Sequence, residues 1–413
     1  MKRPLKIGIL TQYYAPDPPS WIPTGLAREL ARRGHSVRVL TTFPHYETGR
    51  ISHGYRQRSW FEENDGSVRV RRVPIIPSHS QNPIGRIANY LSFVASVLFA
   101  GKFLSEADVI YVYGTPMTVA EPARVWARRR GIPFVLHVQD LWPESVTSSG
   151  LLGRGVGRIV TRVLDVWLRS VYDQANAVLA IAPTMRKMLI ARGVDSSRCH
   201  TVMNWSNDSD GVDAQRLRAK AEREKGLTLV YAGNLGVMQD IEHVIEAVSN
   251  IRDRPGLRVL IAGSGVLELR LRGLVDRLGL RNVEFLGRLS GTELTQVYAS
   301  ADFQLVTLRD LTIFSGTIPS KLQNGLANGV PVITTVGGDV RELVDKERLG
   351  FTAKPEDADS LAQAIRAAYD VGTEERINLS VRARAYYEQN MSMRSAIDQI
   401  EERLSLSARG SRA

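Results

Sequence analysis

The feature that most constrains the fold is an alternation of short apolar runs with helical segments, which occurs in the first half of the chain and starts again in the second. Short apolar runs bounded by turn signals are typical of buried strands, and helices between successive strands are typical of parallel pairing. We interpret as strands the runs 5–10, 36–42, 68–73, 108–113, 133–138 and 177–182, and then 227–233, 257–263, 283–287, 302–308 and 330–335. The sequence therefore predicts an α/β chain with two doubly wound, Rossmann-like domains in series.

The length of the chain supports this division. Its 413 residues exceed what one ordinary core accommodates and suit two domains. The segment 201–226 is polar and strongly charged, so we place the domain boundary there. We predict a first domain over 1–203, a linker over 204–225, a second domain over 226–385, and a C-terminal helix and tail over 386–413.

Composition excludes several classes of protein. Hydrophobic residues make up 43% and charged residues 23% of the chain, which is typical of a soluble globular protein. The single cysteine, Cys199, excludes an intrachain disulfide framework and a multi-cysteine metal site, and it is consistent with a reducing cytosol. The N-terminal stretch MKRPLKIGIL predicts a buried first strand, not a signal peptide, so we expect a cytoplasmic protein.

The net charge of +11 leaves the kind of partner open. Nucleic acid is not expected, because we find no known nucleic-acid module and no aromatic residues interleaved with the basic clusters. An anionic membrane surface or a phosphate-bearing substrate fits the charge, and so does a solvated, arginine-rich surface without a partner. The sequence has no carboxylate and histidine spacing typical of a metal site, so we expect no metal and no other cofactor.

Residues 82–103 contain an apolar run from Tyr90 to Ala100 that lies between Arg86 and Lys102. The run is shorter than the ~20 apolar residues that span a bilayer. Two alternatives stay open: a buried crossover helix, or a helix that lies in a membrane interface with its basic ends at the headgroups. The second alternative would make the protein peripheral on the inner face of the plasma membrane.

The stretch SGTIPSKLQNGLANGVPVITT, residues 315–335, is interpreted as a loop, a helix, a turn and a strand. The first turn of this helix is small and polar and contains Lys321, so free backbone N–H groups and a cation face whatever precedes it. Glycine-rich turns also follow the predicted strands 227–233 and 257–263. One such turn could serve only a tight connection. Three at one sheet edge predict a site for a nucleoside diphosphate.

Motifs in both halves of the chain carry a resemblance to a known family. The second half contains, in order, YAGNLG with DIEHVIEAV, LIAGSG, NVEFLGRLS, ASADFQLV and IPSKLQNGLANGVPVI. The first half contains LARELARRGHSVRVLTTFPHYETG, RVPIIPSHS and HVQDLWPESVTSSGLL. Together they resemble the retaining glycosyltransferases of family 4, which have the GT-B fold. The first-half motifs resemble the branch that contains the N-acetylfucosamine and colanic-acid transferases of bacterial surface polysaccharides.

The resemblance implies two Rossmann-like domains that face a central cleft, with C-terminal helices returning to the first domain. It implies a nucleotide-sugar donor held mainly by the second domain, for which we expect UDP carrying an N-acetylated hexosamine or deoxyhexosamine. The acceptor, a saccharide or a lipid-linked (polyprenyl-diphosphate) saccharide, would be held mainly by the first domain. Retention of configuration would need no protein nucleophile if the leaving phosphate accepts the acceptor's proton on the same face.

The second half departs from the family's pattern at four positions. Gly316 and Asn324 stand where many members have two glutamates, and Asn234 and Gln239 stand where many have an arginine and a lysine that bind the diphosphate. Asn324 can still exchange hydrogen bonds with a ribose hydroxyl, whereas Gly316 offers only its backbone. These departures indicate either an inactive protein or a branch with rearranged contacts.

The first half departs from the pattern once. Gln139 stands where the family has a histidine of the catalytic site, although His137 lies two residues earlier on the same side of the strand. We favour rearranged contacts over loss of activity, because Lys321 can neutralise a leaving diphosphate.

These considerations assign three groups of site residues. The predicted catalytic residues are Lys321, His137 and Asp140. The predicted donor-binding residues are Asn234, Gln239, Gly263, Gly316, Thr317, Ser320, Lys321 and Asn324. The predicted acceptor-binding residues are Tyr14, Trp21, His45, His79 and Glu144. The alternatives are that Lys321 only solvates an exposed turn, and that Asp140 and Glu144 cap the helix that follows them.

Two other functions stay open at this point. A UDP-sugar 2-epimerase would share the two-domain architecture and would form its product without an acceptor. A non-catalytic assembly protein would bind a sugar nucleotide weakly or not at all, and the departures at Gly316, Asn234 and Gln239 are compatible with it.

Overall fold

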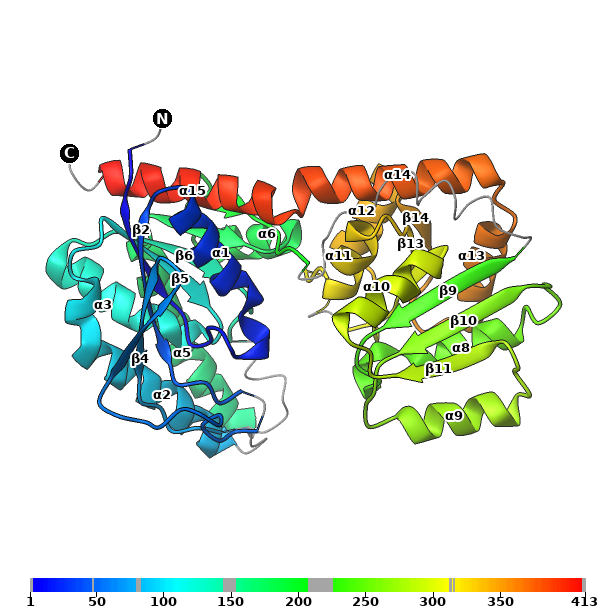
Figure 1. Cartoon of the computed structure of the whole chain (residues 1–413), viewed down its shortest axis with the longest axis horizontal. Helices are drawn as coiled ribbons and strands as arrows, with labels where there is room; N and C mark the ends of the chain where they lie inside the picture. The colour runs from blue at the N-terminus through cyan, green and yellow to red at the C-terminus, as the bar shows by residue number, and fades with distance from the viewer. Residues whose placement is uncertain are drawn as a thin grey trace. The chain divides into compact units, whose positions relative to one another are not determined.

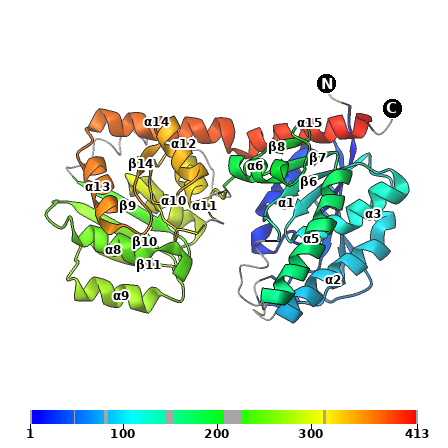
Figure 2. The same cartoon turned by 180° about the vertical axis from the view of Figure 1, so that it is seen from behind.

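The computed structural model describes residues 3–46, 48–78, 83–143, 154–206, 226–311, 314 and 316–410. The chain forms two compact units, Met1–Asn204 with Ala396–Ala413, and Trp205–Ser395. Figure 1 labels the elements of each unit, and Figure 2 gives the reverse view. The first unit ends at the first residue of the predicted linker, most of which lies outside the described residues.

The first unit is built on a sheet with the strand order β3-β4-β2-β1-β5-β6-β7-β8. Its strands are β1 (Lys6–Leu10), β2 (Ser36–Thr42), β3 (Phe61–Asp65), β4 (Val68–Val73), β5 (Val109–Gly114), β6 (Phe134–Val138), β7 (Ala177–Ala180) and β8 (Cys199–Thr201). The pairs are parallel except for β3 with β4, which is antiparallel. The six strands predicted for this half are confirmed. The sequence did not predict β3 and β8, because β3 is a polar edge strand (FEEND) and β8 has only three residues.

Helices cover this sheet (Figure 1). They are α1 (Trp21–Arg32), α2 (Pro83–Ala100), α3 (Ala120–Arg130), α5 (Arg154–Gln174) and α6 (Pro183–Ala191), with the 3₁₀ turns η1 (Pro18–Ser20), η2 (Gly101–Leu104) and η3 (Met117–Val119). From Ala396 onward, α15 (Met393–Gly410) also belongs to this unit. Arg33, which follows α1, pairs with Asp398 and Glu401 at 2.6 Å each. The C-terminal helix therefore returns to the first unit, as the fold class implied.

The second unit is built on a fully parallel sheet with the order β11-β10-β9-β12-β13-β14. Its strands are β9 (Leu227–Ala232), β10 (Leu257–Ala262), β11 (Val283–Gly287), β12 (Phe303–Val306), β13 (Val332–Thr334) and β14 (Gly350–Thr352). Its helices are α8 (Ile241–Ser249), α9 (Glu268–Arg277), α10 (Gly291–Ser300), α11 (Ser320–Ala327), α12 (Asp339–Glu347), α13 (Ala358–Tyr369) and α14 (Thr373–Asn390), with the 3₁₀ turn η4 (Val237–Gln239). The five predicted strands are confirmed, and β14 is a further strand of three residues.

The strand order of each sheet reverses at its first strand. β1 lies between β2 and β5, and β9 lies between β10 and β12. In open α/β sheets, ligands bind outside the carboxyl ends of the strands at such a reversal. A ligand site is therefore expected at the turns after β1 and β5 in the first unit and after β9 and β12 in the second.

The helix α2 is buried on one face only. Phe93 and Val97 are fully buried in the core, whereas Leu91 and Phe99 are exposed at 58% and 93%. By length and composition alone, the segment Gly85–Leu104 could cross a membrane, although a core helix of a soluble protein passes the same test. One face of α2 therefore belongs to the core, and the other face presents exposed apolar side chains.

Candidate active site

Two glycine turns shape the carboxyl edge of the second sheet. Gly233 follows β9 and Gly263 follows β10, with φ angles of 153° and 137°. A Cβ atom at Gly263 would lie 1.8 Å from the carbonyl oxygen of Gly233, so only glycine allows the backbones to approach this closely. The N–H of Leu235 donates to the carbonyl of Ser264 at 3.0 Å and joins the two turns. Gly263 thus has a structural reason to be glycine, and its contact with a donor stays a prediction.

Lys321 lies in the first turn of α11 and extends toward the turn after β9. Its Nζ donates a hydrogen bond to Oε1 of Gln239 at 2.5 Å and lies 5.2 Å from the centre of the Tyr231 ring. Burial lowers the pKa of Lys321 to about 8. In the part of the chain that the structure describes, no carboxylate forms an ion pair with this ammonium group. The alternative that Lys321 solvates an exposed turn does not fit a side chain in this environment.

The helix α11 also leaves its first N–H groups available. The residue before it is Pro319, and among the described residues no side-chain hydrogen bond caps the helix. Helix N-termini without such a cap bind anions through their N–H groups and their positive dipole end. Of the residues predicted to bind the donor here, Ser320 is exposed, Thr317 is half-buried and Gly316 is buried.

Asn234 and Asn324 lie differently from each other. The side chain of Asn234 is exposed after β9, while its backbone carbonyl accepts a hydrogen bond from the Tyr231 hydroxyl at 2.7 Å. The side-chain oxygen of Asn324 accepts a hydrogen bond from the Ser206 hydroxyl at 2.8 Å. The structure therefore places Gln239 in contact with Lys321, whereas Asn324 is hydrogen-bonded to Ser206, near the start of the second unit.

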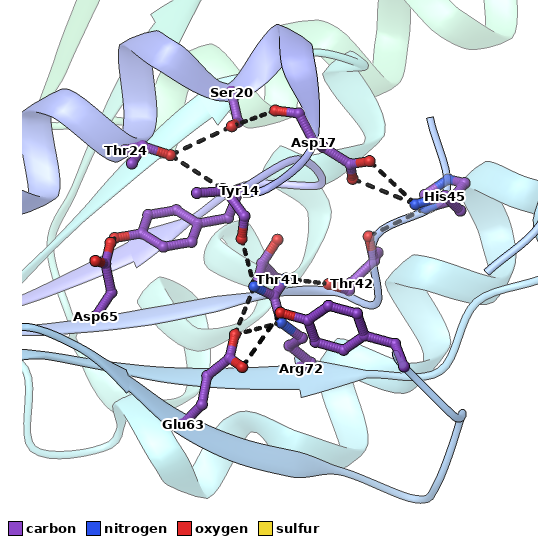
Figure 3. Close-up of polar contacts among 12 residues, drawn as sticks. Tyr14, Asp17, Ser20, Thr24, Thr41, Thr42, His45, Glu63, Asp65 and Arg72 are labelled. Carbon is purple, nitrogen blue, oxygen red and sulfur yellow. Dashed lines mark hydrogen bonds and ion pairs between the residues drawn. The ribbon is translucent and has the colours of Figure 1, made fainter. Parts of the chain in front are cut away.

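At the carboxyl edge of the first sheet, Asp17 organises the turns after β1 and β2 (Figure 3). Its carboxylate accepts hydrogen bonds from the backbone N–H groups of His45 at 3.1 Å and Tyr46 at 3.0 Å. Burial raises the pKa of Asp17 and lowers the pKa of His45. The His45 ring is enclosed, with Nδ1 2.9 Å from the carbonyl of Phe43. His45 is thus part of the framework of this edge, and its contact with an acceptor stays a prediction.

Arg72 is the second organiser of this edge, and the sequence analysis did not single it out. Its guanidinium is buried, pairs with Glu63, and donates to the carbonyls of Thr42 at 3.0 Å and of Ala15 (Figure 3). It also lies 5.0 Å from the centre of the Tyr55 ring. The one signal in the sequence was its position in the arginine-rich strand VRVRRV. An arginine on the inward face of a strand needs a partner, because burying an unpaired charge is unfavourable.

Two further aromatic candidates lie near this framework. The Tyr14 hydroxyl donates to Asp65 at 2.8 Å, and its ring is buried (Figure 3). Trp21 is the first residue of α1 and is half-buried. Tyr14 is therefore a core residue of the described structure, while Trp21 retains exposed surface.

His137 and Asp140, both predicted to be catalytic, occupy different environments. His137 has no exposed surface; Nδ1 lies 2.7 Å from the Tyr111 hydroxyl and Nε2 lies 3.1 Å from the Val202 carbonyl. Burial lowers the pKa of His137 to about 4, so the ring is neutral. Because its ring is enclosed inside the sheet, the structure does not support a catalytic role for His137. Asp140 follows β6, its pKa is raised by burial, and it accepts from the Thr115 hydroxyl at 3.4 Å.

Gln139, His79 and Glu144 are the remaining residues that the sequence singled out in the first half. Gln139, beside Asp140, accepts a hydrogen bond from the Asn204 amide at 2.7 Å. The predicted acceptor residues His79 and Glu144 lie outside the described residues. Within the described residues, no group of three or more histidine, cysteine, aspartate or glutamate side chains could hold a metal ion.

Comparison with known proteins identifies the class to which these two sheets belong. Residues 21–205 match the family described as "Glycosyl transferase 4-like domain", and residues 213–386 match "Glycosyl transferases group 1". Among solved structures, sucrose-phosphate synthase from Thermosynechococcus elongatus superimposes with a TM-score of 0.70 at 16% identity, over 96% of this chain and 98% of that one. Anabaena Alr3699/HepE, in complex with UDP and glucose, superimposes with a TM-score of 0.66 at 18% identity, over 97% and 100%. The chain therefore has the GT-B fold.

The chain belongs to the family 4 glycosyltransferases, with both of their domains present. A colanic acid biosynthesis glycosyl transferase of Escherichia coli (strain K12), WcaI, is 29% identical over 354 residues, which are 82% of this chain and 85% of that protein. A GDP-mannose-dependent alpha-mannosyltransferase of Mycobacterium tuberculosis is 27% identical over 301 residues, 70% and 69% of the two chains. The family expected from the motifs is thereby confirmed.

Proposed function

We propose that the chain transfers a sugar, with retention of configuration, from a nucleoside-diphosphate donor bound by the second unit to an acceptor bound by the first. The observation that carries this proposal is Lys321, a half-buried cation with neutral partners at the carboxyl edge where the strand order reverses. A diphosphate is the anion that such a cation, next to an uncapped helix N-terminus, is suited to stabilise.

In this mechanism the bond between the anomeric carbon and the donor's phosphate oxygen breaks as the acceptor oxygen approaches from the same face. Negative charge then develops on the departing diphosphate. Lys321 and the first N–H groups of α11 stabilise that charge, and the phosphate accepts the proton of the attacking hydroxyl. Asp140, at the edge of the first sheet, would orient the acceptor hydroxyl. We also propose that no metal ion is needed, so a chelator should leave transfer unchanged.

For the donor we propose UDP with an N-acetylated hexosamine or deoxyhexosamine. The HepE complexes with UDP support the base, whereas the mycobacterial relative is GDP-mannose-dependent. For the acceptor we propose a saccharide or a polyprenyl-diphosphate-linked saccharide in surface polysaccharide synthesis. The likeness to a colanic acid biosynthesis enzyme supports this assignment.

The donor can be tested with a panel of nucleotide sugars in a thermal-shift assay, because a ligand that binds only the native state raises the melting temperature. The best ligand is then incubated with and without saccharide acceptors. We expect release of UDP and formation of a glycoside only when an acceptor is present. Formation of an epimer without acceptor would favour the 2-epimerase, and no binding of any nucleotide sugar would favour the non-catalytic assembly protein.

We further propose that the protein is cytoplasmic and peripheral on the inner face of the plasma membrane, with α2 at the lipid surface. This helix exposes Ile87, Leu91, Leu98 and Phe99 and has the exposed basic residues Arg86 and Lys102 near its two ends. An apolar face between basic ends is suited to an anionic interface. A net charge of +11 adds to that attraction.

Sedimentation with lipid vesicles tests the membrane proposal. The wild type should pellet with anionic vesicles, be released by salt, and pellet less with neutral vesicles. Phe99→Glu should reduce pelleting, while Leu269→Glu, a matched change at an exposed apolar residue of the second unit (86% exposed), should not. Equal recovery of all proteins with neutral and anionic vesicles would leave α2 as a partly exposed core helix.

A further inference from the structure

Three residues of β9 and the segment that follows it lie around the side chain of Lys321, and all three are neutral. Gln239 accepts the hydrogen bond from Nζ, and the ring of Tyr231 lies 5.2 Å from that nitrogen. A Cβ atom at Gly233 would lie 2.6 Å from Cε of Lys321, so the absence of a side chain there gives the lysine stem its path. The ammonium group is therefore held in one direction without being neutralised.

The carboxylates nearest to Gln239 in the sequence form ion pairs with residues other than Lys321. Asp240, the residue after Gln239, lies 2.6 Å from Nδ1 of His243 and 3.8 Å from Arg309. Arg309 also lies 3.5 Å from Glu242 and 3.7 Å from Glu356. A cation and a histidine thus face the acidic residues on this side of the turn, so these carboxylates have closer partners than Lys321.

The Tyr231 hydroxyl connects the parts of this arrangement. It donates to the carbonyl of Asn234 at 2.7 Å and lies 3.4 Å from Oε1 of Gln239. The backbone carbonyl of Gln239 in turn accepts from the Thr307 hydroxyl at 2.7 Å, after β12. The position of the amide that meets Lys321 is therefore defined by contacts with both strands at which the order of the sheet reverses.

We propose that Gln239 and Tyr231 are positioning residues that orient Lys321 toward the donor's diphosphate, and that the neutrality of residue 239 determines diphosphate affinity. This inference rests on the proposed function. An amide oxygen orients an ammonium group but leaves its charge for a second ligand. A carboxylate at the same position would form a partly buried ion pair with Lys321, and a diphosphate would have to displace that carboxylate.

The experiment compares Gln239→Glu with Gln239→Met, and uses Gln363→Glu, on the exposed face of α13, as the matched control for an added charge. The probes are UDP and inorganic pyrophosphate, measured by isothermal titration calorimetry. We expect Gln239→Glu to weaken the binding of both probes by about 30-fold, because it pairs Lys321, and Gln239→Met to weaken it by only about threefold. Gln363→Glu should bind like the wild type.

The pH dependence is a readout that a merely structural glutamine would not change. With Lys321→Met as the reference, wild-type affinity should fall above about pH 8, where the free lysine loses its proton. In Gln239→Glu this fall should shift to higher pH, because the carboxylate stabilises the charged lysine.

Tyr231 supplies a second test. Tyr231→Phe keeps the ring beneath Nζ and should retain the affinity of the wild type within about threefold, whereas Tyr231→Leu removes the ring and should lose roughly a further three- to tenfold. Equal affinities and unchanged pH profiles in Gln239→Glu and Gln239→Met would overturn the inference. If Lys321→Met still lost pyrophosphate binding in that case, the proposed function would survive. If the wild type bound neither probe, the proposed function would fail as well.

Discussion

The carboxyl edges of the two sheets each contain a cation shielded from solvent, fully for Arg72 and partly for Lys321, and the two cations have opposite kinds of partner. Arg72 in the first unit is 1% exposed and has Glu63 and backbone carbonyls as partners. Lys321 in the second unit has an amide oxygen and an aromatic ring. Burying a charge is unfavourable unless the charge is paired, so a paired cation is explained by the fold alone. A half-buried cation that meets no anion among the described residues indicates a ligand that supplies one.

The contrast also separates framework residues from site residues. Around Arg72, the polar groups of Tyr14, Asp17 and Asp65 all have partners within the first unit. Such a network makes one arrangement of the turns rigid, which is useful for positioning an acceptor but leaves few groups to contact it. The neutral surroundings of Lys321 do the reverse, since they orient a charge and leave it available.

Removal of Arg72 should have the largest effect. Arg72→Met leaves Glu63 and two backbone carbonyls without their partner, so the free energy of unfolding of the first unit should fall by about 3 kcal/mol. Urea denaturation followed by a probe in the first unit measures this change. Arg69→Met is the control, because Arg69 is an exposed partner of Glu62 at 3.4 Å and should contribute less than ~1 kcal/mol. Similar losses in both variants would remove the distinction on which the comparison depends.

Lys321→Ala should show the opposite combination of effects. We expect kcat to fall by roughly 10²-fold, the scale of a single preorganised group that stabilises the transition state, while the melting temperature without ligand does not fall, because the fold loses a charge whose burial is unfavourable. Steady-state kinetics at saturating donor and a thermal melt of the same preparation are the measurements. Near-normal turnover would contradict the assigned role of Lys321.

The pH dependence of stability should distinguish the two cations further. Burial lowers the pKa of Lys321 from 10.5 to about 8, so between these values the unfolded chain binds more protons at this residue than the folded chain. Stability then rises with pH in this window, and below pH 8 the full penalty of burying the charge is present. The wild type should gain on the order of 2 kcal/mol relative to Lys321→Met between about pH 7.5 and 10. Chemical denaturation at both pH values measures the difference, and a pH-independent difference would show that the ammonium group is not desolvated.

Asn324 should give the smallest effect. If it contacts the donor's ribose in both ground and transition states, Asn324→Ala should raise the donor KM about fivefold and leave kcat nearly unchanged. Ser206→Ala removes the hydrogen bond that Asn324 accepts in the structure and leaves Asn324 itself unchanged. Equal kinetic effects of the two changes would assign Asn324 to the attachment of residues 205–206 and not to the donor.

The sequence by itself determined the order and type of the main elements, because hydrophobic periodicity and glycine turns are local properties of the chain. The eleven runs interpreted as strands all occur in the structure. The helix with Lys321 in its first turn begins at Ser320 and buries Leu322 and Leu326. The short or polar strands β3, β8 and β14 were not predicted, since each lacks the apolar run that a buried strand of ordinary length provides.

Only the tertiary structure decided which side chains meet, because partners far apart in sequence are brought together by the pairing of strands and the packing of helices. Gln239 and Lys321 are 82 positions apart, and parallel pairing of β9 with β12 brings the turns that follow these strands to one edge. His137, chosen from its strand position, proved to be enclosed by Tyr111 and Val202, which no local pattern indicates. A motif thus marks where a charged residue stands in the chain, whereas burial and the nearest partner determine whether its charge stabilises the fold or remains available to a ligand.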